Sequence, residues 1–123
     1  MTAAPARFPG RAPIDAYGNG GFRFAGMSHR GSILCLPSGI YAWSPADPLD
    51  RFSLSSALAE KDAMQLLILG TGAQHTEPSA TVKRVFADAG IGLEVMNTGA
   101  ACRTYNVLLG ERRAVGAALV AVP

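Results

Sequence analysis

Charged residues are scarce in this chain of 123 residues: they make up 16% of it, whereas hydrophobic residues make up 49%. A disordered chain has the opposite balance, so this composition is typical of a compact globular protein. The length is that of one domain. The 11 lysines and arginines are scattered and form no stripe that would neutralise a run of phosphates, so nucleic acid is excluded as a predicted partner.

Cysteine and histidine are also rare, with two of each. Cys35 and Cys102 lie far apart in the sequence, and a chain with a core of this size needs no disulfide. We therefore expect both thiols to be reduced, as in a cytoplasmic protein. The cysteines and histidines lack the close pairing that structural zinc requires, so the sequence predicts no metal site and no other cofactor.

Long apolar runs are absent as well. No stretch approaches the roughly 18 consecutive apolar residues of a membrane span, so we expect no transmembrane segment, and any membrane contact would be peripheral. The first 13 residues contain arginines but lack the apolar core of a secretory signal. We predict a disordered tail over residues 1–13, followed by a single domain over residues 14–123.

The first half of the domain is predicted to be β-structure. Residues 14–17 lead into a glycine-rich turn at 18–21, and residues 22–26 then alternate between apolar and polar side chains. Two further strands are predicted over 32–37 and 39–44. A short turn separates these two strands, so we expect them to be antiparallel neighbours.

Strands and helices alternate in the second half. The elements predicted there are a short helix within 53–63, a strand over 65–69, a helix that begins at 76–78 and ends at Gly90, a strand over 92–96, a helix over 100–109 and a strand within 112–122. The helix before Gly90 is indicated by apolar residues that repeat at helical spacing. Such alternation is typical of crossover units with a parallel sheet. The predicted fold class is therefore α/β, with antiparallel hairpins sharing a sheet with the α/β half.

A glycine-rich turn, Gly70–Gly72, follows the strand that ends at Leu69. The turn lacks the third glycine of a dinucleotide-binding fingerprint, because His75 stands at that position, and it lacks the lysine of a P-loop. Two interpretations remain. The turn is either a tight exit from the sheet, with the Thr71 hydroxyl bonded locally, or a nest of backbone N–H groups that binds an anion or another ligand.

A second loop, over residues 97–106, leaves the neighbouring strand and runs into a helix. If the two strands are parallel, both loops meet at one edge of the sheet. We expect Thr98 to cap the helix, whose N-terminus would favour an anion or lower the pKa of Cys102. The alternative is a buried, unreactive thiol, because a nucleophilic cysteine needs a base and neither His29 nor His75 is identifiable as that base.

Three stretches carry a resemblance to a known family: GSILCLPSGIYAW (31–43), LLILGTG (66–72) and GIGLEVMNTGAACRTYNVLLGERRAVGAAL (90–119). In this order they resemble the Mth938-like family, also called DUF498, over residues 14–122. The resemblance implies a three-layer α/β fold, in which helices flank a central mixed sheet beside a smaller antiparallel β element. The segment over 16–32 is similar to bacterial members, which implies a bacterial, cytoplasmic protein.

The resemblance implies association and brings no known reaction. The family includes the mitochondrial assembly factor of respiratory complex I, a non-catalytic protein that works with partner subunits at the inner membrane. We therefore expect an interaction protein with a protein partner, namely an assembly factor for a respiratory or other membrane-protein complex. The protein itself is expected to associate peripherally with the inner membrane. The positions that match the family motifs are Gly70, Thr71, Gly72, Thr98, Cys102, Thr104, Tyr105, Asn106 and Glu111.

The alternative function is a small-ligand or anion-binding protein, or an enzyme, that uses the paired loops at 70–75 and 97–106. The ligand-binding residues predicted for it are Gly70, Thr71, Gly72, His75, Thr98, Cys102, Thr104 and Asn106. No catalytic residue is predicted, because the sequence offers no spaced carboxylate pair and no evident base for the thiol. The sequence therefore favours the non-catalytic function.

Overall fold

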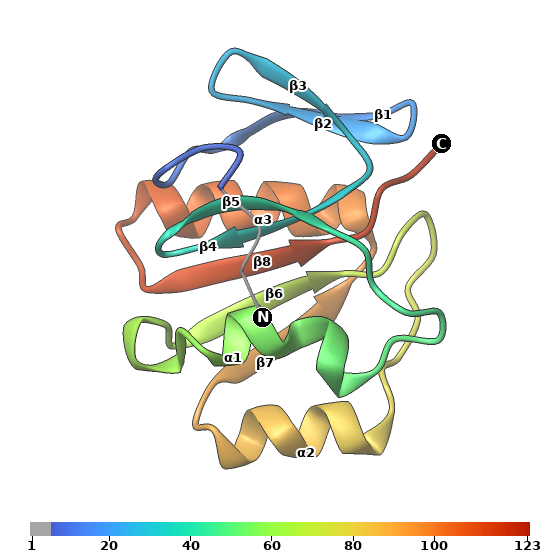
Figure 1. Ribbon diagram of the computed structural model, residues 1–123, viewed down its shortest axis with the longest axis vertical. Coiled ribbons are helices and arrows are strands. Elements are labelled where there is room, and N and C mark those ends of the chain that lie inside the picture. The colour runs from blue at the N-terminus through green and yellow to red at the C-terminus, as the bar shows by residue number, and fades with distance from the viewer. Residues whose placement is uncertain (1–5) are drawn as a thin grey trace.

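The computed structural model describes residues 6–123, which form two β-sheets and three α-helices (Figure 1). The strands are β1 (Ile14–Gly18), β2 (Gly21–Phe24), β3 (Met27–Arg30), β4 (Ser32–Leu36), β5 (Gly39–Trp43), β6 (Leu66–Gly70), β7 (Gly92–Met96) and β8 (Val115–Leu119). The helices are α1 (Ser55–Leu58), α2 (Ala80–Asp88) and α3 (Thr98–Gly110), and 3-10 turns at Arg51–Leu54 and Lys61–Ala63 flank α1. Within residues 6–123, no helix has both the length and the apolar character needed to cross a membrane.

The main sheet has the strand order β5-β4-β8-β6-β7, and β1, β2 and β3 form a separate antiparallel sheet. In the main sheet β4 is antiparallel to β5 and β8, whereas β6 is parallel to β7 and β8. All five residues of β8 are buried, in keeping with its apolar sequence and central position. Because β6, β7 and β8 are parallel, their carboxyl ends meet at one edge of the sheet, where α/β folds commonly bind ligands.

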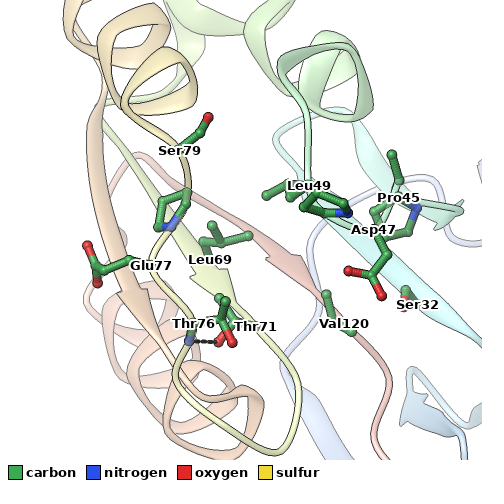
Figure 2. A pocket seen from close by; sticks show the side chains of 13 residues that line it. Ser32, Pro45, Asp47, Leu49, Leu69, Thr71, Thr76, Glu77, Ser79 and Val120 are labelled. Carbon is green, nitrogen blue, oxygen red and sulfur yellow. Dashed lines mark hydrogen bonds between the residues drawn. The ribbon is translucent and has the colours of Figure 1, made fainter.

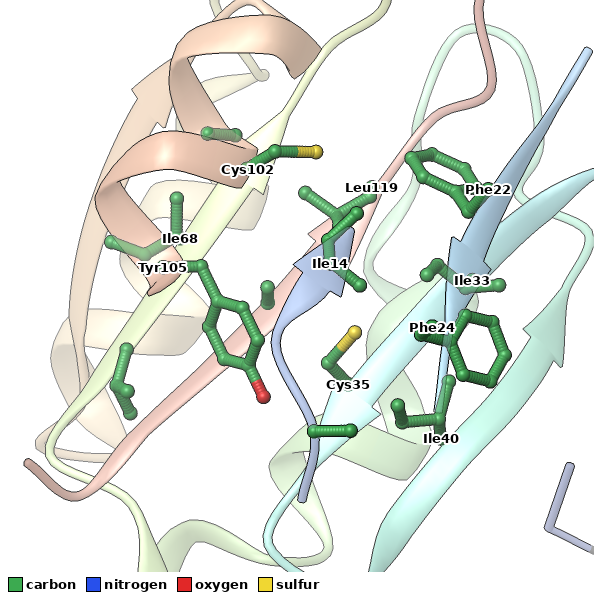
Figure 3. Packing of buried hydrophobic residues seen from close by; sticks show 14 residues of the cluster. Ile14, Phe22, Phe24, Ile33, Cys35, Ile40, Ile68, Cys102, Tyr105 and Leu119 are labelled. Carbon is green, nitrogen blue, oxygen red and sulfur yellow. The ribbon is translucent and has the colours of Figure 1, made fainter. Parts of the chain in front are cut away.

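Successive residues of β6 point to opposite faces of the main sheet and fill two cores. Ile68 packs with Tyr105 in the core beneath α3 and the small sheet (Figure 3). Leu67 and Leu69 pack with Phe86 of α2 in the core on the other face. The molecule therefore has three layers, with the mixed sheet between α3 plus the small sheet on one side and α1 plus α2 on the other. The α/β prediction is confirmed.

Helix α2 begins later than the sequence predicts. Its cap is Ser79, whose Oγ accepts a hydrogen bond from the Val82 N–H at 3.2 Å. Thr76 belongs to the preceding loop, because its N–H donates to Thr71 Oγ1 at 3.0 Å. A hydrogen bond within the loop that follows β6 thus holds Thr76 outside the helix, and helical periodicity does not reveal such a bond.

Two other elements differ from expectation. The helix predicted within 53–63 shrinks to the single turn of α1. The 3-10 turn before it is capped by Asp50, whose Oδ1 accepts the Ser53 N–H at 2.8 Å. Strand β3 is not predicted at all, because its sequence, MSHR, has no apolar alternation. It forms through backbone pairing with β2.

Residues 6–13, predicted as part of a disordered tail, lie against the rest of the chain. Phe8 forms an isolated bridge with Ile40 of β5, whose N–H donates to the Phe8 carbonyl at 2.9 Å. Ala12 is buried in the core beneath α3. Apolar side chains and backbone groups of residues 6–13 thus find partners in the rest of the chain, and the disorder predicted for residues 1–13 stays a prediction. The remainder of that predicted tail, residues 1–5, lies outside the described residues.

Asn106 of α3 fastens the small sheet to the main layer. Its Oδ1 accepts a hydrogen bond from the Ile14 N–H at 2.8 Å, and its Nδ2 donates to the Ile14 carbonyl at 2.8 Å. The side-chain amide thus satisfies both backbone groups of one residue of β1, as a neighbouring strand would.

We expect Asn106→Ala to lower the free energy of unfolding by about 1–3 kcal/mol, because both Ile14 groups lose their partner in a partly buried place. Thr104→Ala is the matched control, since Thr104 lies on the same helix, is half-buried and makes no described side-chain hydrogen bond; its effect should stay below about 1 kcal/mol. Urea denaturation of the two variants measures both values. Equal losses in the two variants would contradict the role of Asn106.

Candidate functional site

The side chain of Thr98 joins the loops that follow β6 and β7. Its buried Oγ1 donates to the Val120 carbonyl at 2.7 Å and accepts the Gly72 N–H at 2.9 Å. A backbone hydrogen bond runs from the Thr98 N–H to the Gly72 carbonyl at 2.8 Å. The two loops therefore lie side by side at one edge of the main sheet, and the prediction that they meet is confirmed.

Thr98 does not cap α3, contrary to the prediction. The cap is Asn97, whose Oδ1 accepts the Ala100 N–H at 2.9 Å. Asparagine and threonine are both common at this position, so the sequence alone does not distinguish two adjacent candidates. The difference is tertiary: the Thr98 side chain is turned inward, where Val120 needs a donor.

The Gly70–Gly72 turn is bonded from within the protein. The Thr71 N–H donates to the Met96 carbonyl at 2.9 Å, and the N–H of the glycine after it is taken by the Thr98 hydroxyl. The Thr71 hydroxyl donates to the Gln74 carbonyl at 2.7 Å and accepts the Thr76 N–H, a bond drawn in Figure 2. This geometry is the locally bonded turn of the first interpretation, and two N–H groups of the expected nest are already occupied.

Cys102 lies in the core beneath α3 (Figure 3). Burial raises the pKa of its thiol to about 11, although the neighbouring Arg103 charge acts in the opposite direction. The lowered pKa considered for this residue is therefore not found, because loss of hydration on burial outweighs the Arg103 charge. Cys35 lies in the same core with a pKa also raised by burial, and both thiols are free.

The remaining predicted residues do not converge on one point. His75 is exposed, and its Nε2 contacts Glu77 Oε2 at 2.5 Å. Both the oxygen and the nitrogen of the Asn106 amide are hydrogen-bonded to Ile14 of β1, and Thr104 is half-buried further along α3. The structure thus brings Gly70–Gly72 together with the start of α3 and directs the other candidates elsewhere. Ligand binding by any of these residues stays a prediction.

A cleft of about 460 Å³ opens beside the Thr71 loop, at the carboxyl edge of β6 (Figure 2). One wall is the proline-rich segment 45–49, the other is the segment 76–79, and Leu69 and Val120 lie between them. The residues that line it are Ser32, Pro45, Ala46, Asp47, Pro48, Leu49, Leu69, Thr71, Thr76, Glu77, Pro78, Ser79 and Val120. Sequence reasoning misses this cleft, because no element or site is predicted for the segment 45–49.

The two acidic side chains of the cleft differ in their surroundings. Asp47 stands on one wall, whereas Glu77, on the other, is paired with Lys83 and His75, and its carboxylate points away from the opposite wall (Figure 2). The pKa of Glu77 is lowered by hydrogen bonds from Lys83 and, to a lesser degree, His75, so this carboxylate is ionised. No histidine, cysteine or lysine is among the described lining residues. In residues 6–123 there is also no group of three or more His, Cys, Asp and Glu side chains placed to hold a metal ion.

The Thr98 hydroxyl bonds are open to a direct test. Thr98→Val keeps the shape of the side chain but leaves the Gly72 N–H and the Val120 carbonyl without a partner, so we expect the free energy of unfolding to fall by about 2–4 kcal/mol. Thr98→Ser, which retains the hydroxyl, should lose less than Thr98→Val. Denaturant unfolding measures the free energy of unfolding of both variants. A Thr98→Val variant as stable as the wild type would show that the hydroxyl bonds do not stabilise the fold.

Known proteins similar to this chain include bacterial and mitochondrial sequences. A family model described as protein of unknown function (DUF498/DUF598) matches residues 14–120. The chain is 38% identical over 116 residues to an uncharacterised protein of Rhodobacter capsulatus, a match that covers 94% of this chain and 90% of that protein. It is 32% identical over 120 residues to mouse NADH dehydrogenase (ubiquinone) 1 alpha subcomplex assembly factor 3, covering 94% of this chain but only 64% of the mouse protein.

Solved structures of similar proteins have the same fold as this chain. A crystal structure described as an outer membrane protein from Bartonella henselae is similar with a TM-score of 0.92 and 51% identity, over 95% of this chain and 100% of that one. A solution structure of a Mth938-like domain from Bordetella pertussis is similar in fold, with a TM-score of 0.77 at 24% identity, over 98% of this chain and 91% of that one. The fold is Mth938-like, and the family match over residues 14–120 shows that this chain belongs to the DUF498 family.

Proposed function

We propose that this chain is a non-catalytic binding protein that assists the assembly of a respiratory NADH dehydrogenase or another membrane-protein complex. The observation that carries the proposal is its similarity to the mouse assembly factor over 94% of the chain. The human factor gives the same signal, with 32% identity over 114 residues. Because the chain spans less than two thirds of the length of either factor, the proposal concerns only the shared domain.

The arrangement of the paired loops supports binding without chemistry. The Thr71 and Thr98 hydroxyls serve bonds within the protein, and so does the Asn106 amide. Cys102 is held in the core with a raised pKa, and neither His29 nor His75 is among its described hydrogen-bond partners. A nucleophile needs an adjacent base and access to substrate, and the described contacts give this thiol neither.

A second candidate, a small-ligand protein, is favoured by the cleft beside Thr71. Its volume suits a small molecule, and its position at the carboxyl edge of parallel strands is common for ligand sites. Asp47 on one wall favours a cationic group on that ligand, whereas the Glu77 carboxylate is already paired with Lys83 and His75. Under this candidate Thr71 lines the cleft, and Thr98 acts indirectly by bonding the backbone of Gly72 and of the lining residue Val120.

The proposal also assigns a location. We infer a cytoplasmic protein that associates peripherally with the inner membrane, where a respiratory complex is assembled. The similar Bartonella protein is described as an outer membrane protein, and this description suggests the outer membrane as the alternative location for this chain. Fractionation of the native host with an antibody to the chain separates the two: recovery in the outer membrane fraction would contradict the inferred location.

The test of the proposed function is deletion of the gene in its native host. We expect less assembled NADH dehydrogenase in the membranes by native electrophoresis, and recovery of its subunits with the tagged chain, identified by mass spectrometry. Cys102→Ala should restore assembly as well as the wild type, since the thiol has no assigned chemistry. The control is a second respiratory complex, which should be unchanged.

Two results would overturn the proposal. The first is a deletion strain with normal levels of NADH dehydrogenase and every other membrane complex. The second is a turnover of host metabolites by the purified chain that disappears in Cys102→Ala while capture of partner subunits is unchanged. The second result would make the chain an enzyme and Cys102 its nucleophile.

A further inference from the structure

The two edge strands of the main sheet differ in whether their outer side is paired. At one edge, β5 is bridged by Phe8, which bonds to Ile40 in both directions. At the other edge, β7 pairs with β6 on one side, and no described residue pairs with its other side. An unpaired edge strand presents a row of backbone donors and acceptors to another chain.

Two printed hydrogen bonds fix which residues of β7 face outward. The Gly92 N–H donates to the Gln65 carbonyl at 2.9 Å, and the Met96 carbonyl accepts the Thr71 N–H at 2.9 Å. Both ends of the strand therefore point their backbone groups toward β6. Because these groups alternate in direction along a strand, the N–H and C=O groups of Leu93 and Val95 point to the open side. No other residue in 6–123 is recorded as bonding to them.

An apolar groove accompanies this open edge on the α2 side of the sheet. It has a volume of about 570 Å³. Its lining residues are Glu77, Lys83, Phe86, Ala87, Ile91, Gly92, Leu93 and Val95. An added strand would place the residues opposite Leu93 and Val95 on the same face as those two side chains, and hence beside this groove. Apolar side chains at those two positions would be removed from water there.

The charge of Glu94 indicates which partner residue is favoured between the two apolar positions. Glu94 is exposed and points to the opposite face of the sheet from Leu93 and Val95. The other charges of the groove, Glu77 and Lys83, pair with each other at 2.6 Å. A lysine or arginine opposite Glu94 is therefore favoured by charge.

A second copy of this chain fits the edge less well. Symmetric antiparallel pairing centred on β7 would place Glu94 directly opposite the same residue of the partner copy. Like charges in directly opposed positions are destabilising. The charge at the centre of the strand therefore opposes self-pairing and favours a basic partner strand.

We propose that the β7 edge, residues 92–96, binds an extended apolar-basic-apolar segment of a partner protein as an additional strand of the main sheet. The backbone of Leu93 and Val95 supplies the hydrogen bonds, the α2 groove receives the apolar side chains, and Glu94 selects the basic one. This inference rests on the proposed function, because it names the surface through which the assembly partner is held.

The probe for the test is a synthetic acetylated and amidated peptide, Thr-Val-Lys-Val-Thr, added to the isotope-labelled full chain. We expect the Leu93 and Val95 amides to become protected from hydrogen exchange in NMR spectra. Val95→Pro removes one outward N–H, as tolerated on edge strands, and should weaken binding about tenfold; the matched control Val95→Ala keeps the N–H and should weaken it less. Far-ultraviolet circular dichroism checks that both variants fold.

A charge exchange gives a test that does not depend on the proline variant. A peptide with glutamate in place of lysine should bind the wild type more weakly, and Glu94→Lys should reverse that preference. The absence of protection at Leu93 and Val95, or of any reversal with Glu94→Lys, would overturn the inference. Concentration-dependent protection of both amides without peptide would also overturn it, by making a second copy the occupant.

The inference and the proposed function can fail separately. If folded Val95→Pro loses the peptide but still captures NADH dehydrogenase subunits as well as the wild type, the β7 edge is not the partner surface and the proposed function stands. If the peptide binds as described but neither capture nor complex assembly depends on the chain, the proposed function fails and the edge remains a strand-binding site.

Discussion

A single buried hydroxyl holds together the end of the sheet from which all the candidate loops emerge. Thr98 Oγ1 links the turn after β6, the start of α3 and the segment that leaves β8. Its burial is permitted because both the donor and the acceptor capacity of the hydroxyl are used. Gly70 is favoured by the same packing, since a Cβ there would lie 3.0 Å from Ala101 Cβ and 3.1 Å from Thr98 Cα, which is tighter than nearly all such contacts.

This constraint changes the meaning of the glycine-threonine-glycine turn. The Thr71 and Gly72 N–H groups, which the sequence suggested as an anion site, bond instead to Met96 and Thr98 and thereby position α3 against β6. The turn therefore has a structural role. The surfaces left open to other molecules lie beside it: the cleft that contains Asp47 and the β7 edge with Leu93 and Val95. The β7 edge is the surface proposed for the assembly partner, and the cleft is the surface that the small-ligand candidate would use.

Sequence reasoning succeeds here where a local pattern decides the structure. The strand before Gly70 is apolar and ends at a glycine turn, and the meeting of the two loops follows from parallel strands. It fails where a distant contact decides. Asn97 rather than Thr98 caps α3, because the Thr98 hydroxyl is bonded to Val120, and Asp47 lines a cleft with Thr71 and Val120. For Cys102 the sequence left a reactive and a buried thiol open, and only the packing of the core decides for the buried one.

Amide hydrogen exchange of the wild-type chain by NMR tests most directly the claim that the turn is internally bonded while the β7 edge is open. The account predicts strong protection of the Thr71 and Gly72 amides, comparable to that of the β6 interior, and rapid exchange at Leu93 and Val95. Rapid exchange at Gly72 together with protection at Val95 would contradict it, because the turn would then be free to bind a ligand and the edge already occupied.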